Sequence, residues 1–266
     1  MPYRSTTRPA AERETTRLPA RRPLPVIAVV GPALALLFGL ALLLAGPGYQ
    51  WGWWEYRTGF VILRWSAIGG LVAALASLLG AAATRPGSGR RGFGLALLGL
   101  VVGSAVAAVP WWLRHSAQGT PAIHDITTDV ENPPRFAAVL PRRAGAPNPA
   151  DYGGPEVAAQ QREAYPDIRP LELNVPAARA FALARAAAGE LGWEIVAADS
   201  ASGRIEATDR TFWFGFLDDI VVRITPRGNG SRIDVRSVSR VGKGDAGTNA
   251  RRVRRFLERV RQAVGQ

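Results

Sequence analysis

The sequence predicts a protein in two parts: three membrane-spanning helices, then an α+β domain with an antiparallel sheet of four to five strands covered by two helices. Three observations lead to this fold class. Long apolar runs occupy most of the first 113 residues. A proline-rich segment follows them at residues 114–170. Residues 171–266 then combine short strand-like stretches with two helical ones, which is the pattern of a sheet with helices on one face.

The three apolar runs cover residues 25–45, 60–83 and 93–113, and Arg64 is their only charged residue. A helix of roughly 20 apolar residues crosses a hydrocarbon core of about 30 Å. None of the runs shows the polar stripe of an amphipathic soluble helix. A cleaved signal peptide is the alternative for the first run. Its apolar stretch exceeds the roughly 7–15 residues of such a peptide, so an uncleaved span is favoured.

The arginines predict the orientation of the spans. The basic tail at residues 1–24 and the loop between the second and third runs are rich in arginine, whereas the loop between the first two runs balances Arg57 with Glu55. Positively charged loops stay in the cytoplasm. Tryptophan and tyrosine residues gather in the first loop and at the end of the third run, as expected at one membrane interface. We therefore expect a multi-pass protein of the bacterial cytoplasmic (inner) membrane, with a cytoplasmic N-terminus and an extracytoplasmic C-terminal domain.

The net charge of +12 belongs mainly to the membrane part. Residues 1–113 hold 11 arginines and three acidic residues, or +8, whereas residues 114–266 hold 22 basic and 18 acidic residues, or +4. The excess suits attraction to anionic lipids, and membrane lipids are the expected partners. The nearly balanced outer domain lacks the basic bias of a nucleic-acid-binding protein. Without cysteine, the chain has no disulfide, thiolate nucleophile or cysteine metal site; no cofactor and no metal are expected.

The outer part combines helical and strand-like patterns. Within the proline-rich segment only residues 155–165 have a helical pattern, with proline at the first position. An alanine-rich helix is expected at 176–191 and an amphipathic one at 248–264, whose apolar residues keep i, i+3, i+4 spacing. Strands are expected at 193–198, 204–208, 211–217, 220–225 and 232–241, the last two joined by the hairpin sequence PRGNGS.

No recognised catalytic constellation is present, and the best candidate site is one face of the sheet. Strand alternation places Glu206, Arg223, Asp234 and Arg236 on the same face. One interpretation is a ladder of cross-strand ion pairs on a solvated surface. The other is a polar groove in which Arg223, Arg236 and Arg240 bind an anionic ligand, with Trp213 in its wall. Both interpretations remain open at this point.

Other polar clusters are weaker candidates. His124, Asp125 and Asp129 could help to hold a cation or serve a hydrolase, although Asp129 before a Pro-Pro pair more often makes local turn hydrogen bonds. Asp218 and Asp219 invite a general acid/base interpretation, but neighbouring strand residues point to opposite faces. The arginines of the last helix form either a phosphate or lipid-headgroup patch or the solvated face of an amphipathic helix. They are Arg251, Arg252, Arg254, Arg255, Arg259 and Arg261.

Several separated blocks resemble a known family. They are HDITTDVENPPRF (124–136), YPD (165–167), RIEATDRTFWFGFLDDIVVRI (204–224) and IDVRSVSRVGKGDAGTNARRVRRFL (233–257). Together they resemble the bacterial domain of unknown function 1499 family over residues 120–262, and members with preceding membrane spans fit the architecture. The family has no agreed reaction, so the resemblance implies no catalytic residues.

Two classes of function follow. The preferred one is a non-enzymatic binding or accessory domain, held outside the membrane by three spans, for a lipid, an envelope component or a partner protein. The alternative is an envelope hydrolase or transferase that uses the Asp and His residues of the proline-rich segment. A transporter is disfavoured because three spans form a pore only by oligomerising.

Overall fold

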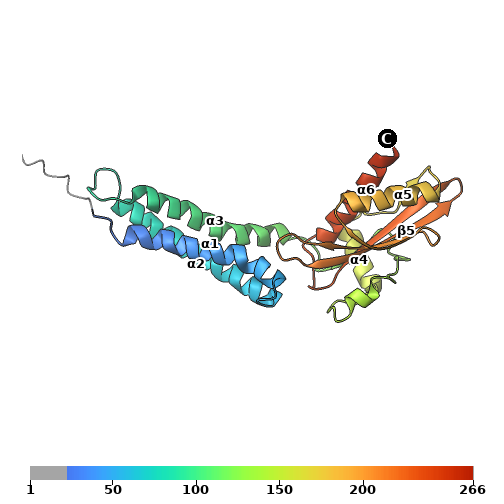
Figure 1. The fold of residues 1–266 in the computed structure, drawn as a ribbon, viewed down its shortest axis with the longest axis horizontal. Coiled ribbons are helices and arrows are strands. Elements are labelled where there is room, and N and C mark those ends of the chain that lie inside the picture. The colour runs from blue at the N-terminus through green and yellow to red at the C-terminus, as the bar shows by residue number, and fades with distance from the viewer. Residues whose placement is uncertain (1–22, 266) are drawn as a thin grey trace, which may run out of the picture.

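The computed structural model describes residues 23–265, in which a long helix bundle and a compact α+β domain lie end to end (Figure 1). The predicted basic tail lies, up to residue 22, outside these described residues. The fold class predicted from the sequence is confirmed: three apolar helices precede a domain built on an antiparallel sheet.

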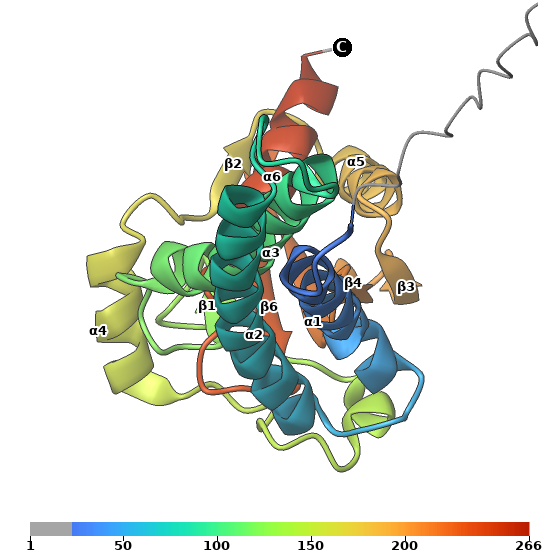
Figure 2. The ribbon, with the colours of Figure 1, turned by 90° about the vertical axis from the view of Figure 1, so that its left-hand side faces the viewer.

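The bundle consists of α1 (Ile27–Gln50), α2 (Tyr56–Ala83) and α3 (Phe93–Ala117). Each helix is long and apolar enough to cross a membrane. The three helices lie side by side in a view along the bundle (Figure 2). Large apolar side chains such as Leu36, Leu71 and Leu98 point outward and are exposed, while the contacts between helices are made by small residues.

Glycine allows the helices to approach closely. A Cβ atom on Gly103 of α3 would lie 2.8 Å from the backbone nitrogen of Ala74 and 2.9 Å from the carbonyl oxygen of Gly70, both on α2. A Cβ atom on Gly99, one turn earlier, would meet Ser77 and Pro32. The small-xxx-small pair at Gly99 and Gly103 therefore lies at a helix–helix contact, as such pairs do in membrane bundles.

The outer domain contains a six-stranded antiparallel sheet. Its strands are β1 (Asp125–Thr127), β2 (Leu171–Leu173), β3 (Glu194–Asp199), β4 (Arg204–Arg210), β5 (Leu217–Arg227) and β6 (Gly230–Ser239). The order across the sheet is β1-β6-β5-β4-β3. Strand β2 also pairs with β6, at residues 231–233, whereas β1 pairs with β6 at residues 236–238. The two shortest strands, β1 and β2, were not predicted from the sequence.

Helices α5 (Ala177–Glu190) and α6 (Thr248–Val264) cover one face of the sheet (Figure 1). Alternate strand residues such as Ile205, Val222 and Val235 meet the apolar faces of both helices in the main hydrophobic core. Trp193 stacks on Phe256 with 5.0 Å between the ring centroids. Burial of these side chains, at about 25 cal/mol per Å² of apolar surface, is the main stabilising term for this layer.

The opposite face of the sheet is covered by the proline-rich segment. This segment contains the 3-10 helix η1 (Leu140–Arg143) and α4 (Gly154–Ala164). Phe136 and Val139 pack on Val221 and Val238 of the sheet in a small second core. The sheet is therefore enclosed on both faces, one apolar and one largely ionic.

The strand predicted at 211–217 is wrong. Residues Thr211–Phe216 form a turn between β4 and β5, closed by backbone bonds from Thr211 N to Phe216 O and from Gly215 N to Thr211 O, each 2.9 Å. Gly215 has φ +66°, a left-handed conformation that glycine adopts readily. The aromatic run predicted a strand, but Trp213, Phe214 and Phe216 pack against the helix bundle instead, while Phe212 is exposed.

Candidate functional site

One end of the outer domain faces the bundle. The β4–β5 turn lies there, because the side-chain amide of Gln50, the last residue of α1, donates to the carbonyl oxygens of Phe212 at 3.2 Å and Trp213 at 2.7 Å. The start of α6 lies at the same end, since Asn249 donates to the carbonyl oxygen of His124, seven residues beyond α3. We call this the bundle-facing end of the domain.

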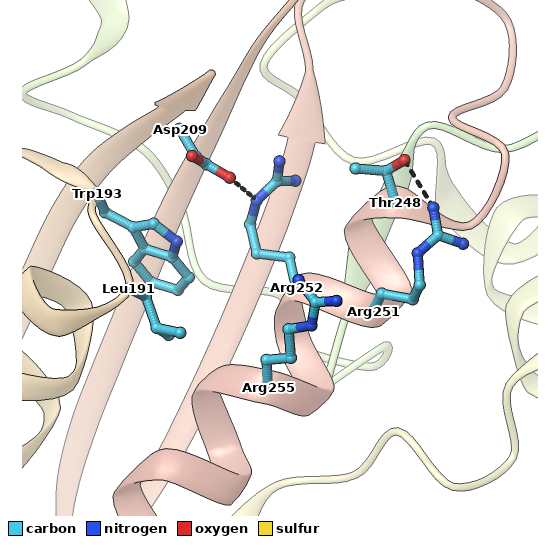
Figure 3. A pocket seen from close by; sticks show the side chains of 7 residues that line it. All are labelled: Leu191, Trp193, Asp209, Thr248, Arg251, Arg252 and Arg255. Atoms are coloured by element: carbon cyan, nitrogen blue, oxygen red, sulfur yellow. Dashed lines mark hydrogen bonds and ion pairs between the residues drawn. The ribbon is translucent and has the colours of Figure 1, made fainter. Parts of the chain in front are cut away.

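A pocket of about 120 Å³ opens at this end. At roughly 30 Å³ per water molecule, this is the space of about four waters. It lies between the first two turns of α6, the end of α5 and the end of β4 (Figure 3). Its lining residues are Leu191, Trp193, Asp209, Thr248, Arg251, Arg252 and Arg255.

Arg252 forms the rigid wall of the pocket. Its guanidinium group is buried and donates to Asp209 at 2.8 Å and to Asp218 at 2.7 Å. Two further bonds reach Asn249 Oδ1 at 2.5 Å and Ser237 Oγ at 3.2 Å. Four of the five N–H groups of this guanidinium thus donate to protein groups, and two carboxylates offset its charge.

Arg251 and Arg255 are different, because they are exposed and lie next to the pocket with no acidic partner among the described residues. In the described part of the chain, Arg251 donates only to the carbonyl oxygen of Ala246 at 3.0 Å and to Thr248 Oγ1 at 3.1 Å. Figure 3 shows the second contact. The remaining arginines of α6 have acidic neighbours: Arg254 with Asp167, Arg259 with Glu190 and Arg261 with Glu258. The pocket therefore has two arginines, Arg251 and Arg255, that form no ion pair with the described acidic residues.

The first turn of α6 is already capped. Asp245 accepts hydrogen bonds from the backbone N–H groups of Gly247 at 2.9 Å and Asn249 at 2.5 Å. Burial raises the pKa of Asp245 although these two bonds oppose the shift. The helix terminus is consequently occupied by a protein carboxylate, and the cationic character of the pocket comes from the arginine side chains.

The predicted arginine face of the sheet exists, but its interpretation as a solvated surface is wrong. Glu206, Asp234 and Arg236 are almost completely buried beneath the proline-rich segment. Arg236 makes a bidentate pair with Asp125, with N–O distances of 2.9 and 2.7 Å, and also donates to the carbonyl oxygens of Pro134 and Ala150. Sequence reasoning missed the cover because extended proline-rich chain shows no periodicity.

Two more ion clusters complete this buried layer. Asp219 accepts from Arg240 at two 2.8 Å contacts, from Arg143 at 2.6 Å and from Thr208 at 2.7 Å. Burial acts to raise the pKa of Asp219, but the bonds from Arg240, Thr208 and Arg143 outweigh it and hold the pKa below its usual value.

At the other end of the layer, Arg223 and Arg232 share Asp129 and Asp234, with N–O distances of 2.9–3.0 Å. Arg223, Arg236 and Arg240, the three predicted anion ligands, are therefore each bound to aspartate. The structure brings them onto one face, where each is paired with a carboxylate beside the covering segment.

His124, Asp125 and Asp129, the candidate residues of the proline-rich segment, each have different contacts. Asp125 belongs to the Arg236 pair, and Asp129 also accepts from the backbone N–H groups of Glu131 and Asn132, the local turn bonds that its sequence context indicates. His124 lies 3.4 Å from the carbonyl oxygen of Lys243. Within residues 23–265, no three His, Asp or Glu side chains are grouped closely enough to hold a metal ion.

Asp218 and Asp219 point to opposite faces, as strand alternation predicts. Asp218 meets Arg252 on the helix-covered face, whereas Asp219 meets Arg143 and Arg240 on the other. Trp213 lies on neither face of the sheet, because the β4–β5 turn places it against the helix bundle.

The pocket residues Leu191, Trp193 and Asp209 were not singled out from the sequence. The sequence pattern places Leu191 and Trp193 at the end of a helix and predicts that they belong to the hydrophobic core. It places Asp209 at the end of a strand. The arginines of α6 were considered as a headgroup patch, and their periodicity supplied that signal. Which of these arginines has an acidic partner depends mainly on Asp and Glu residues far from α6 in the sequence. The sequence of the helix alone does not show those partners.

A family model described as "Protein of unknown function (DUF1499)" matches residues 125–260, which is just over half of the chain and nearly all of the outer domain. No curated protein matches the chain.

Proposed function

We propose that this chain, which belongs to the DUF1499 family of proteins of unknown function, is a three-span inner-membrane protein whose extracytoplasmic domain binds the phosphate group of an anionic lipid. The binding site is the pocket at the bundle-facing end, and the ligand is bound without being chemically changed. The spans hold the pocket next to the lipid surface, so the ligand does not have to leave the membrane.

The orientation rests on charge. Arg85, Arg90 and Arg91 lie in the loop between α2 and α3, at the end of the bundle away from the outer domain. Trp51, Trp53, Trp111 and Trp112 lie at the opposite end, near the domain, and are exposed. Positive loops favour the cytoplasm and tryptophan favours the interface, which supports an outer domain on the extracytoplasmic side.

The observation that carries the proposal is the pair of unneutralised arginines, Arg251 and Arg255, beside a phosphate-sized pocket at the bundle-facing end. Guanidinium groups donate paired hydrogen bonds to phosphate oxygens. Arg252, fixed by Asp209 and Asp218, provides a rigid wall, and Trp193 and Leu191 supply an apolar one. The three arginines against two carboxylates leave the site cationic.

The buried sheet face gives less support to a function in ligand binding or catalysis. Asp125 and Asp129, on which the hydrolase hypothesis depends, are ion-paired with Arg236 and with Arg223 and Arg232. Both carboxylates are thus already engaged by charge-assisted hydrogen bonds from arginine. These residues instead stabilise the cover of the sheet.

The test uses the full chain in nanodiscs of phosphatidylcholine with added phosphatidylglycerol, and native mass spectrometry counts the phosphatidylglycerol retained. The double variant R251A/R255A should retain less. Each lost charge-assisted hydrogen bond is worth about 1.4 kcal/mol or more, so we expect the affinity to fall roughly tenfold per arginine.

The matched control is R179A/R185A, which removes two exposed arginines from α5, away from the pocket. It should retain lipid like the wild type. Equal retention by R251A/R255A and the wild type would refute the site, and inorganic phosphate as a competitor distinguishes a headgroup from a free anion. Alkaline phosphatase fused to the C-terminus should be active, and an inactive fusion would refute the orientation.

A further inference from the structure

A second feature of the bundle-facing end concerns α1 rather than the pocket. Pro47 lies inside α1 and has no N–H group, so it cannot donate the helical bond to the carbonyl oxygen of Leu43, four residues earlier. The indole N–H of Trp213, from the β4–β5 turn, points to that oxygen at 3.4 Å. A side chain of the outer domain thus reaches the one carbonyl that proline leaves free in this turn of the helix.

Leu43 lies within the apolar run of the first helix. It is seven residues before Gln50, the end of α1, which is about 10 Å at 1.5 Å per residue. The same side of α1 is apolar, since Leu40, Leu43 and Leu44 are exposed there. In hydrocarbon an unsatisfied carbonyl costs several kcal/mol. The hydrogen bond from Trp213 therefore stabilises the structure most when this part of α1 lies in lipid.

The bundle is shaped to receive the turn. A Cβ atom on Gly46 of α1 would lie 2.3 Å from the carbonyl oxygen of Trp213, and one on Gly59 of α2 would lie 2.8 Å from the ring of Phe214. Phe214 stacks on Phe60 with 5.0 Å between centroids, and Phe216 lies 5.7 Å from Tyr49. Glycine at both positions lets the turn lie directly on the helices.

Phe212 is the remaining aromatic residue of the turn, and its side chain is 99% exposed. Its backbone is held at the level of Gln50 by the bond to its carbonyl oxygen. The exposed tryptophans Trp51, Trp53, Trp111 and Trp112 surround this end of the bundle. A fully exposed phenylalanine next to an apolar helix and an aromatic belt is favourable only if something apolar covers it.

We infer that the β4–β5 turn, Thr211–Phe216, inserts into the bilayer beside α1, with Phe212 and Trp213 among the outermost acyl-chain segments. The occupant of this surface is lipid, because the turn continues the exposed apolar face of α1. The outer domain then contacts the membrane through its own turn as well as through the spans. This insertion is independent of phosphate binding by the pocket.

The absence of cysteine from the chain makes a direct test simple. A nitroxide spin label is attached to F212C in full-length protein in phosphatidylcholine nanodiscs at one copy per disc. Collision rates with oxygen, which concentrates in hydrocarbon, and with a water-soluble nickel chelate are compared. L40C, on the exposed face of α1, and N229C, on the distal hairpin between β5 and β6, are the lipid and water controls.

The ratio of oxygen to nickel collisions at position 212 should be several-fold higher than at position 229 and close to that at position 40. A ratio like that of N229C overturns the inference, because Phe212 would face water. Low collision rates with both reagents overturn it as well, because protein would then cover the turn. Since Phe212 makes no buried contact, the label does not disturb the fold, and the L40C and N229C ratios verify correct assembly.

Discussion

The buried pair of Asp125 and Arg236 permits a quantitative prediction for D125A. Both side chains are almost fully buried, and two charge-assisted bonds of 2.9 and 2.7 Å join them. Without Asp125 the guanidinium keeps the carbonyl oxygens of Pro134 and Ala150 and its contacts with the rings of Phe136 and Tyr152, none of which carries a negative charge. A buried cation without a counter-charge is costly.

The expected cost is about 3–5 kcal/mol, the usual effect of removing one partner of a buried pair. This is a large part of a stability of roughly 5–15 kcal/mol for the domain. Amide hydrogen exchange of the full chain in nanodiscs measures it locally, on peptides that contain β1 and β6. Exchange there should accelerate by about two to four powers of ten, at 1.4 kcal/mol for each power.

The control is the pair of Asp167 and Arg254, which is also bidentate, at 2.6 and 2.7 Å, but exposed. Solvent screening limits such pairs to about 0–1 kcal/mol, so D167A should change exchange by less than about tenfold. If D125A and D167A accelerate exchange equally, burial does not set the strength of these pairs. The same result would also remove the case for an ionic layer that fixes the cover on the sheet.

Two further predictions concern pH and helix packing. The pKa of Asp245 is raised by burial, so its contribution to stability is full below the ordinary aspartate value of about 3.9 and is lost as pH rises through the folded value. D245N keeps one of the two acceptor oxygens of Asp245 and cannot titrate, so its melting temperature relative to the wild type should be higher at pH 7 than near pH 3; a difference that does not change with pH would contradict this. G103L should separate α2 from α3 at a cost of about 1–3 kcal/mol, seen as a lower melting temperature in detergent, whereas G94L, with nothing within 4 Å of its Cβ position, should melt like the wild type.

The elements that sequence reasoning placed well are those whose signal is local. The helix expected at 248–264 is found as Thr248–Val264, because its apolar residues repeat at helical spacing and Phe256 and Val260 are buried in the core. The three apolar helices follow from length and composition alone. Alternation likewise placed Asp218 and Asp219 on opposite faces of β5.

The elements that were missed depend on contacts far along the chain. Phe212 and Trp213 have strong strand propensity, but their partners are Leu43 and Gln50 of α1, more than 160 residues earlier. The short strand β1 exists because β6 pairs with it. The arginine face was expected to be solvated because nothing in an extended proline-rich sequence shows that it lies over a sheet.

The pairing of Asp125 with Arg236 also constrains when the domain can fold during synthesis. These residues are separated by 111 positions, and the chain between them includes four of the six strands completely. At about 5–20 residues per second, Asp125 leaves the ribosome roughly 6–20 s before its partner. During that interval the proline-rich segment after α3 has no arginine face to cover, and β6, which pairs with β1, β2 and β5, is the last strand to arrive. Completion of the domain is therefore a late, non-local event, and a chain truncated before β6 leaves its carboxylates, its proline-rich cover and both short edge strands without their partners.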